Sequence, residues 1–160
     1  MGKIDEAREI LKKIGMPSEQ QNDMACLTLL TLAGIKPDSK WSQATNEWIR
    51  IHDVLQFASE YYDKVYAENT RETIRKSCMH QFREAALIED NVKATNSPNY
   101  RYRITNEALD VIRAYGTSEW LMTLQRYHAY HEKLVDKYAS KKKMKLMPVH
   151  INSQDYSFSP

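Results

Sequence analysis

The spacing of apolar residues changes in one short stretch of the chain, and this change limits the folds open to it. From residue 4 to residue 86 the apolar residues recur every three or four positions, the period of an α-helix. Between residues 87 and 104 they alternate, so that Tyr100, Tyr102 and Ile104 are separated by Arg101 and Arg103. Helical spacing returns from residue 106. The sequence therefore predicts a mainly helical protein with one small β-hairpin.

Several signals mark where the predicted helices begin and end. Ser18 stands three residues before Gln21, and Asn69 three residues before Glu72, a spacing that favours capping boxes. The near-continuous apolar run of residues 24–32 is expected at the centre of the bundle, with Cys26 as a buried, unreactive thiol. The predicted helices are 4–14, 19–33, 46–62, 70–86, 106–115 and a long one from Thr117 or Ser118 to about residue 143.

The remaining segments set the hairpin and a domain boundary. A strand begins at Leu87, residues 93–99 form a polar tip, and the second strand covers residues 100–105. Residues 147–151 are typical of the start of a further strand. We therefore expect a helical domain over residues 1–143 and a connector over residues 144–160.

The order of helix 46–62, a short connection, helix 70–86 and a hairpin is that of a winged helix-turn-helix. In that arrangement the second helix enters the major groove of DNA and the hairpin, or wing, lies along the backbone or in the minor groove. If Ile74, Cys78 and Phe82 face inward, a helical wheel turns Met79 outward together with a set of polar side chains. The predicted DNA-contacting residues are Arg71, Thr73, Arg75, Lys76, His80 and Arg83 on the helix, and Asn96, Asn99, Arg101 and Arg103 on the hairpin, where Lys93 adds charge.

The distribution of charge agrees with this prediction. The net charge is only +2, but residues 1–69 carry −3, whereas residues 70–103 carry +3 and residues 126–160 carry +4. Local fields attract a polyanion more than net charge does. The alternative is that these basic side chains only face solvent, and winged helices also serve as protein-interaction modules.

Five short stretches carry a specific resemblance to one family. They are residues 15–22 leading into 27–30, residues 41–42, residues 67–75, residues 80–82 with 86–88, and residues 96–98. Together they resemble the N-terminal domain of the BsuBI/PstI restriction endonucleases over about residues 4–125, and the run from Asn69 to Arg75 is the most specific part. The resemblance implies a type II restriction enzyme that binds double-stranded DNA at a palindromic six-base site, CTGCAG in the namesakes, and acts as a homodimer in its full length.

Members of that family cleave DNA in a C-terminal nuclease domain that uses Mg²⁺. Such chemistry needs carboxylates and a lysine that converge on the metal. Only Asp38-Ser39-Lys40 has the spacing of the usual acidic triplet, and it lies in a loop led by proline. We therefore expect no catalytic residue and no metal or cofactor site in residues 1–160, with residues 144–160 leading into an absent nuclease domain. His128, His131 and Glu132 share a helical face, but no further ligand accompanies them.

Two other functions remain open from the sequence. One is a complete, stand-alone winged helix-turn-helix regulator of a restriction-modification operon, and the other is a protein-interaction module whose binding does not depend on salt. The longest apolar stretch, residues 25–34, is too short to span a bilayer, and charged residues interrupt the start of the chain. With only two cysteines, no disulfide framework is expected, so we expect a cytoplasmic protein without a membrane segment.

Overall fold

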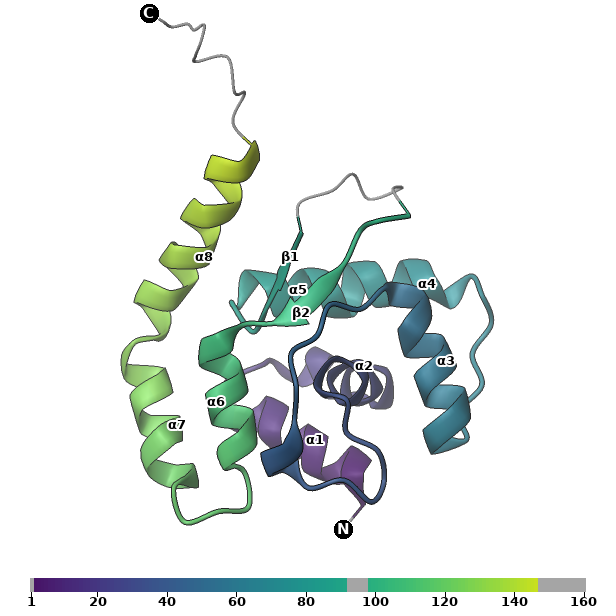
Figure 1. Cartoon of the computed structure of the whole chain (residues 1–160), viewed down its shortest axis with the longest axis horizontal. Helices are drawn as coiled ribbons and strands as arrows, with labels where there is room; N and C mark the ends of the chain where they lie inside the picture. The colour runs from purple at the N-terminus through teal and green to yellow at the C-terminus, as the bar shows by residue number, and fades with distance from the viewer. Residues whose placement is uncertain (1, 92–97, 147–160) are drawn as a thin grey trace, which may run out of the picture.

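The computed structural model describes residues 2–91 and 98–146, and it confirms a mainly helical bundle with a small hairpin (Figure 1). α1 (Lys3–Lys13) forms as expected, and α2 (Asp23–Ala33) ends where the sequence predicts but starts at Asp23 rather than at residue 19. Every residue of α2 from Ala25 to Ala33 is buried. α2 packs against α1, α3 (Ile51–Tyr62), the segment η3 (Ile74–Met79) and the strand β2 (Tyr102–Ile104), which makes it the centre of the core. Gly34 ends it with φ of 68°, the left-handed conformation that glycine adopts without strain.

The predicted capping box at Ser18 is wrong. Residues Ser18–Gln20 form a short 3₁₀ turn, and α2 begins only after Asn22. The Asn22 side chain accepts a hydrogen bond from the Ala25 amide at 2.8 Å, so an amide oxygen rather than a hydroxyl caps the helix.

The third helix is shorter than the sequence predicts. α3 covers Ile51–Tyr62, whereas residues 46–50 are not helical. Ile49 and Tyr102 exchange two backbone hydrogen bonds of 2.8 Å each, so this segment pairs with the hairpin. Asp53 then accepts a hydrogen bond from the Arg50 amide at 2.8 Å and marks the start of α3. Tertiary pairing has overridden the local helical pattern.

The next helix is continuous but changes its type of winding. It comprises α4 (Thr70–Thr73), a π-helical segment η3 (Ile74–Met79) and α5 (His80–Glu84), and we call it the 70–84 helix. Residues five apart share a face in π-helical winding, and both Ile74 and Met79 are fully buried. The outward position predicted for Met79 is therefore wrong. The capping role predicted for Asn69 and Glu72 is also wrong, because Glu72 binds the side chain of Arg75 instead.

The hairpin pairs β1 (Ile88–Asp90) with β2 (Tyr102–Ile104) in antiparallel register. Ile49 lies on the other side of β2, so β2 is central in this small sheet. Figure 1 shows the hairpin crossing the 70–84 helix. Most of its predicted tip, including Lys93 and Asn96, lies outside the described residues.

Residues 106–146, the last part of the chain that the structure describes, hold three helices rather than two. α6 (Asn106–Ala114) matches the prediction, but the expected single helix after residue 117 consists of α7 (Trp120–Ala129) and α8 (His131–Leu146). Neither Thr117 nor Ser118 supplies the N-cap of α7, which is Glu119. The break at Tyr130 lets α7 pack on α6 while α8 runs alongside the hairpin (Figure 1). The strand predicted at residues 147–151 lies outside the described residues. Within the described residues, no helix is both long and apolar enough to cross a membrane.

Candidate nucleic-acid interface

The outer side of the 70–84 helix is polar and open to solvent. Arg71, Thr73, Lys76 and His80 are exposed, and 67% of the Lys76 side chain is accessible. The inner side is buried, since Ile74, Cys78, Met79 and Phe82 join the core. The structure thus separates the two sides of this helix as the sequence predicts, apart from Met79, which is buried, and Arg83, which is largely covered.

Two hollows flank the place where the hairpin crosses this helix, and Tyr100 and Tyr102 line both. The first, of about 310 Å³, is lined also by Arg75, Lys76, His80 and Arg83, and the second, of about 260 Å³, by Arg50, Ile51, His52, Arg71 and Pro98. We call the cationic and imidazole side chains of both hollows the basic surface: Arg50, His52, Arg71, Arg75, Lys76, His80 and Arg83. Such a concave, donor-rich surface suits phosphates and guanine edges.

Glu72 lies on the exposed side of the 70–84 helix between two of these cations, Arg75 and Lys76. Its hydrogen bond with Arg75 lowers its pKa, and Lys76 lies 3.6 Å away from the same carboxylate. The carboxylate therefore stays ionised at neutral pH and holds Arg75 on the helix surface. Lys76, in contrast, remains largely accessible.

Arg83 does not point into solvent as the helical wheel suggests. Only 20% of its side chain is exposed, and Nη1 donates to Asp90 at 2.9 Å and to the Tyr100 hydroxyl at 3.3 Å. Burial alone would lower the pKa of Arg83, but the hydrogen bond with Asp90 raises it. The guanidinium is therefore a permanent cation bound inside the protein, at the edge of the basic surface.

The two hairpin arginines lie apart from the basic surface. Side chains alternate along a strand, so Arg103 points to the face opposite Tyr102. There its Nε donates to Glu89 at 3.0 Å, and its guanidinium carbon lies over the Trp48 ring, 4.4 Å from the ring centre. Arg101 donates to the carbonyl oxygen of Pro98 at 2.7 Å. Asn99 is exposed on the described edge of the hairpin tip, and Asn96 lies outside the described residues.

Comparison with known proteins places the chain in a family. A family model described as the BsuBI/PstI restriction endonuclease HTH domain matches residues 1–136. The chain belongs to this family. The BsuBI/PstI resemblance predicted from five short stretches is therefore confirmed over most of the chain.

The relatives of this BsuBI/PstI domain are restriction enzymes. The chain is 39% identical over 152 residues to the type II restriction enzyme BsuBI of Bacillus subtilis, covering 92% of the chain and 48% of the relative. It is 31% identical over 149 residues to the type II restriction enzyme AplI of Arthrospira platensis, covering 91% and 46%. The solved SdaI restriction endonuclease superposes with a TM-score of 0.76 at 29% identity, over 95% of this chain and 49% of that one. The chain spans about half the length of these relatives.

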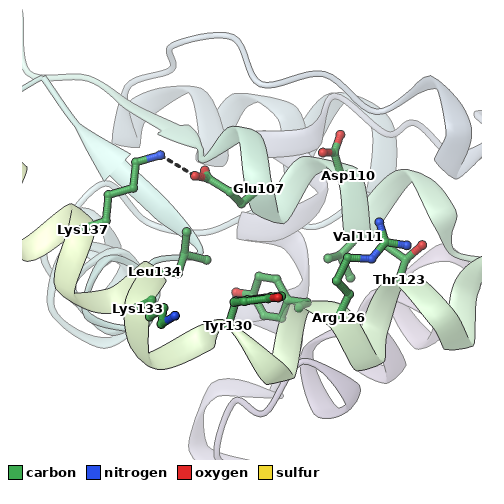
Figure 2. A pocket seen from close by; sticks show the side chains of 10 residues that line it. Glu107, Asp110, Val111, Thr123, Arg126, Tyr130, Lys133, Leu134 and Lys137 are labelled. Carbon is green, nitrogen blue, oxygen red and sulfur yellow. Dashed lines mark hydrogen bonds and ion pairs between the residues drawn. The ribbon is translucent and has the colours of Figure 1, made fainter.

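A further hollow of this BsuBI/PstI domain, of about 350 Å³, lies between α6 on one side and α7 and α8 on the other (Figure 2). We call it the α6–α8 groove. Its α6 wall carries Glu107 and Asp110, and its other wall carries Arg126, Lys133 and Lys137, of which Lys137 binds Glu107 at 2.6 Å. Val111, Tyr127 and Leu134 contribute apolar surface, and the groove shares no residue with the basic surface.

The two histidines considered as metal ligands have other partners. The Nε2 atom of His128 lies 2.7 Å from the carbonyl oxygen of Lys13, and that of His131 lies 2.8 Å from the carbonyl oxygen of Ala85. Within residues 2–91 and 98–146, no group of three or more His, Cys, Asp or Glu side chains is placed to hold a metal ion.

Sequence reasoning missed Arg50 and His52, which belong to the basic surface because α3 starts at Ile51 rather than at residue 46. Asp53, three residues after Arg50, is the acid expected in the first turn of a helix and was the available signal. It also missed Tyr100 and Tyr102 as lining residues, because their place depends on how the hairpin crosses the helix.

Proposed function

We propose that this chain is the DNA-recognition domain of a type II restriction endonuclease and that it places the 70–84 helix in the major groove of double-stranded DNA. The observation that carries the proposal is the basic surface, which gathers seven cationic or imidazole side chains around the exposed side of that helix. Family membership supports it independently.

The positions of the side chains suggest their roles. Thr73, Lys76 and His80 are exposed on the outer side of the helix and are assigned to base edges, where lysine and hydroxyl groups supply donors. Arg71, Arg75, Arg50 and His52 lie in the flanking hollows and are assigned to phosphates. Asn96, Asn99 and Arg101 remain predicted backbone contacts of the wing.

The finer points of the function follow from the family. We propose a palindromic six-base site, CTGCAG as in the namesakes, and a homodimer in the full-length enzyme, since a two-fold symmetric site suits two copies related by the same symmetry. We assign Mg²⁺-dependent cleavage to the half of the relatives that this chain does not span, because the acidic triplet typical of such nucleases is matched in this sequence only by Asp38-Ser39-Lys40. Cleavage of DNA inside the cell, together with the free cysteines Cys26 and Cys78, supports a cytoplasmic location.

Fluorescence anisotropy with two duplexes tests the proposal. One duplex contains CTGCAG and the other has the same bases shuffled. The parent protein is expected to prefer the first, and its affinity for both is expected to fall steeply as salt rises, because phosphate contacts release counterions. Replacement of a base-contacting side chain is expected to cost about 1–3 kcal/mol, so Lys76→Ala should weaken binding to the CTGCAG duplex.

Lys133→Ala is the matched control, since Lys133 is an exposed lysine in the α6–α8 groove. Equal effects of the two substitutions would contradict the assignment of the interface. Binding that shows no dependence on salt would favour the protein-interaction module, and salt-dependent binding to an operator without preference for the six-base site would favour the regulator.

A further inference from the structure

Four side chains form a continuous series of polar contacts from α8 to the exposed side of the 70–84 helix. Lys142 of α8 donates to Asp90 of β1 at 2.7 Å, and Arg83 donates to the same carboxylate oxygen at 2.9 Å. The other amino group of Arg83, Nη2, lies 3.0 Å from Nδ1 of His80. Each step is short enough for a hydrogen bond.

The last step fixes the chemical form of His80. A guanidinium has only donors, so its contact with Nδ1 requires that this atom accept the hydrogen bond. The neutral ring then carries its proton on Nε2. Because His80 is exposed on the helix surface, Arg83 sets it up as a donor.

Asp90, in the middle of this series of contacts, is a buried carboxylate whose charge depends on its partners. Only 1% of the Asp90 side chain is exposed, and the Tyr100 hydroxyl donates to it at 2.9 Å. Burial alone would raise the pKa of Asp90, but the hydrogen bonds from Lys142, Tyr100 and Arg83 lower it. Removing a cation from a buried carboxylate costs free energy. The positions of Lys142 and Arg83 are therefore coupled, because both bind the same carboxylate.

α8 is held at the same place by two further contacts. His131 at its start contacts the carbonyl oxygen of Ala85, directly after α5, and Lys141 binds Glu89 of β1 at 3.1 Å. A small hollow of about 80 Å³, lined by Arg83, Asp90, Tyr138 and Lys142 among others, lies between α8 and the hairpin. α8 is thus seated on the hairpin and the end of the 70–84 helix together.

We propose that Lys142, Asp90 and Arg83 form a relay that positions His80 as a hydrogen-bond donor on the recognition side, so that α8 affects the choice of DNA site without touching DNA. This inference rests on the proposed DNA-binding function for its consequence, but the geometry of the relay does not. Arg83 is in this account a positioning residue rather than a DNA contact.

Nuclear magnetic resonance of the free protein tests the relay without DNA. The ring ¹⁵N shifts of His80 report whether Nδ1 accepts a hydrogen bond and which nitrogen carries the proton. We expect an Nδ1 acceptor in the parent, loss of that signature in Arg83→Met, and a shift in the same direction in Lys142→Met. Lys143→Met is the matched control, because the neighbouring Lys143 is exposed and makes no ion pair within the part of the chain that the structure describes, and it should leave the signature unchanged.

A double-mutant cycle tests the consequence for DNA. Selectivity is the ratio of the Kd for the shuffled duplex to the Kd for the CTGCAG duplex. We expect His80→Ala to lower it on the order of tenfold and Lys142→Met to lower it about threefold. In the His80→Ala background Lys142→Met should not lower selectivity further, because the side chain that the relay positions is absent.

The outcomes separate the relay from the proposed function. If the parent does not prefer the CTGCAG duplex, the proposed function fails at that site while the His80 resonances still decide on the relay. The relay is overturned if Arg83→Met leaves the Nδ1 resonance of His80 unchanged, if Lys143→Met shifts it as Lys142→Met does, or if Lys142→Met lowers selectivity by the same factor with and without His80.

Discussion

The basic surface and the α6–α8 groove are both hollowed and both rich in charged side chains, but their charges are arranged differently. Every charged side chain that lines the two hollows of the basic surface is basic. The acids Asp53, Glu68, Glu72 and Asp90 pair with these cations and histidines but do not line the hollows. In the groove, acids on α6 face cations on α7 and α8, and one pair is already in contact (Figure 2). A hollow whose lining charges are all basic attracts a polyanion, whereas facing walls of opposite sign neutralise each other.

The largest expected effect concerns the inner side of the 70–84 helix, which must be attached to the core for its outer side to act as a surface. Phe82 is fully buried, and Phe82→Ala is expected to lower the free energy of unfolding by about 3–5 kcal/mol because it leaves a cavity. Urea denaturation measures this. Leu121, which is 70% exposed, is the control, and Leu121→Ala should change stability by less than about 0.5 kcal/mol. Similar losses at both positions would contradict the assigned packing.

The next largest effect is a loss of DNA affinity on replacing a residue of the basic surface. Arg50 is assigned to a phosphate, so Arg50→Ala should weaken binding to all duplexes by a similar factor and reduce the salt slope of log K by about 1. Titrations at several salt concentrations with both duplexes measure it. Arg126→Ala removes an arginine from the groove and should leave the slope unchanged. A loss at Arg50 confined to the CTGCAG duplex would instead make it a base contact.

The smallest expected effect lies in the groove. Lys137→Met breaks the ion pair with Glu107 at the protein surface, where such pairs contribute about 0–1 kcal/mol. Stability should therefore change by less than about 1 kcal/mol, and the affinity for DNA should remain that of the parent. A clear loss of DNA affinity would mean that the two surfaces are not separate in function.

The elements that the sequence predicted well are those with local signals. Helices α1 and α6 show regular apolar spacing, the near-continuous apolar run of residues 24–32 predicted the body of α2, and the alternation from Tyr100 to Ile104 predicted the hairpin. The errors arose where distant segments decide the conformation. Ile49, within the non-helical residues 46–50, pairs with Tyr102 of β2. The break between α7 and α8 at Tyr130 is flanked by His128 and His131, which contact Lys13 and Ala85 far along the chain.

The candidate site, like the fold, was predictable where local signals decide and not where distant segments do. Exposure of Lys76 and His80 follows from the helical period, so the wheel placed them correctly. It failed at Met79, because π-helical winding turns less per residue than the wheel assumes. It also treated Arg83 as free, since nothing local shows that the hairpin brings Asp90 and Tyr100 to its guanidinium.

Lysine acetylation footprinting tests the central claim most directly, because it compares the two surfaces in one experiment. Lys76 on the 70–84 helix and Lys133 in the groove are both exposed. With a saturating CTGCAG duplex, the account predicts that modification of Lys76 slows strongly while that of Lys133 keeps its rate. Unchanged modification of Lys76, or protection of Lys133 in its place, would contradict it.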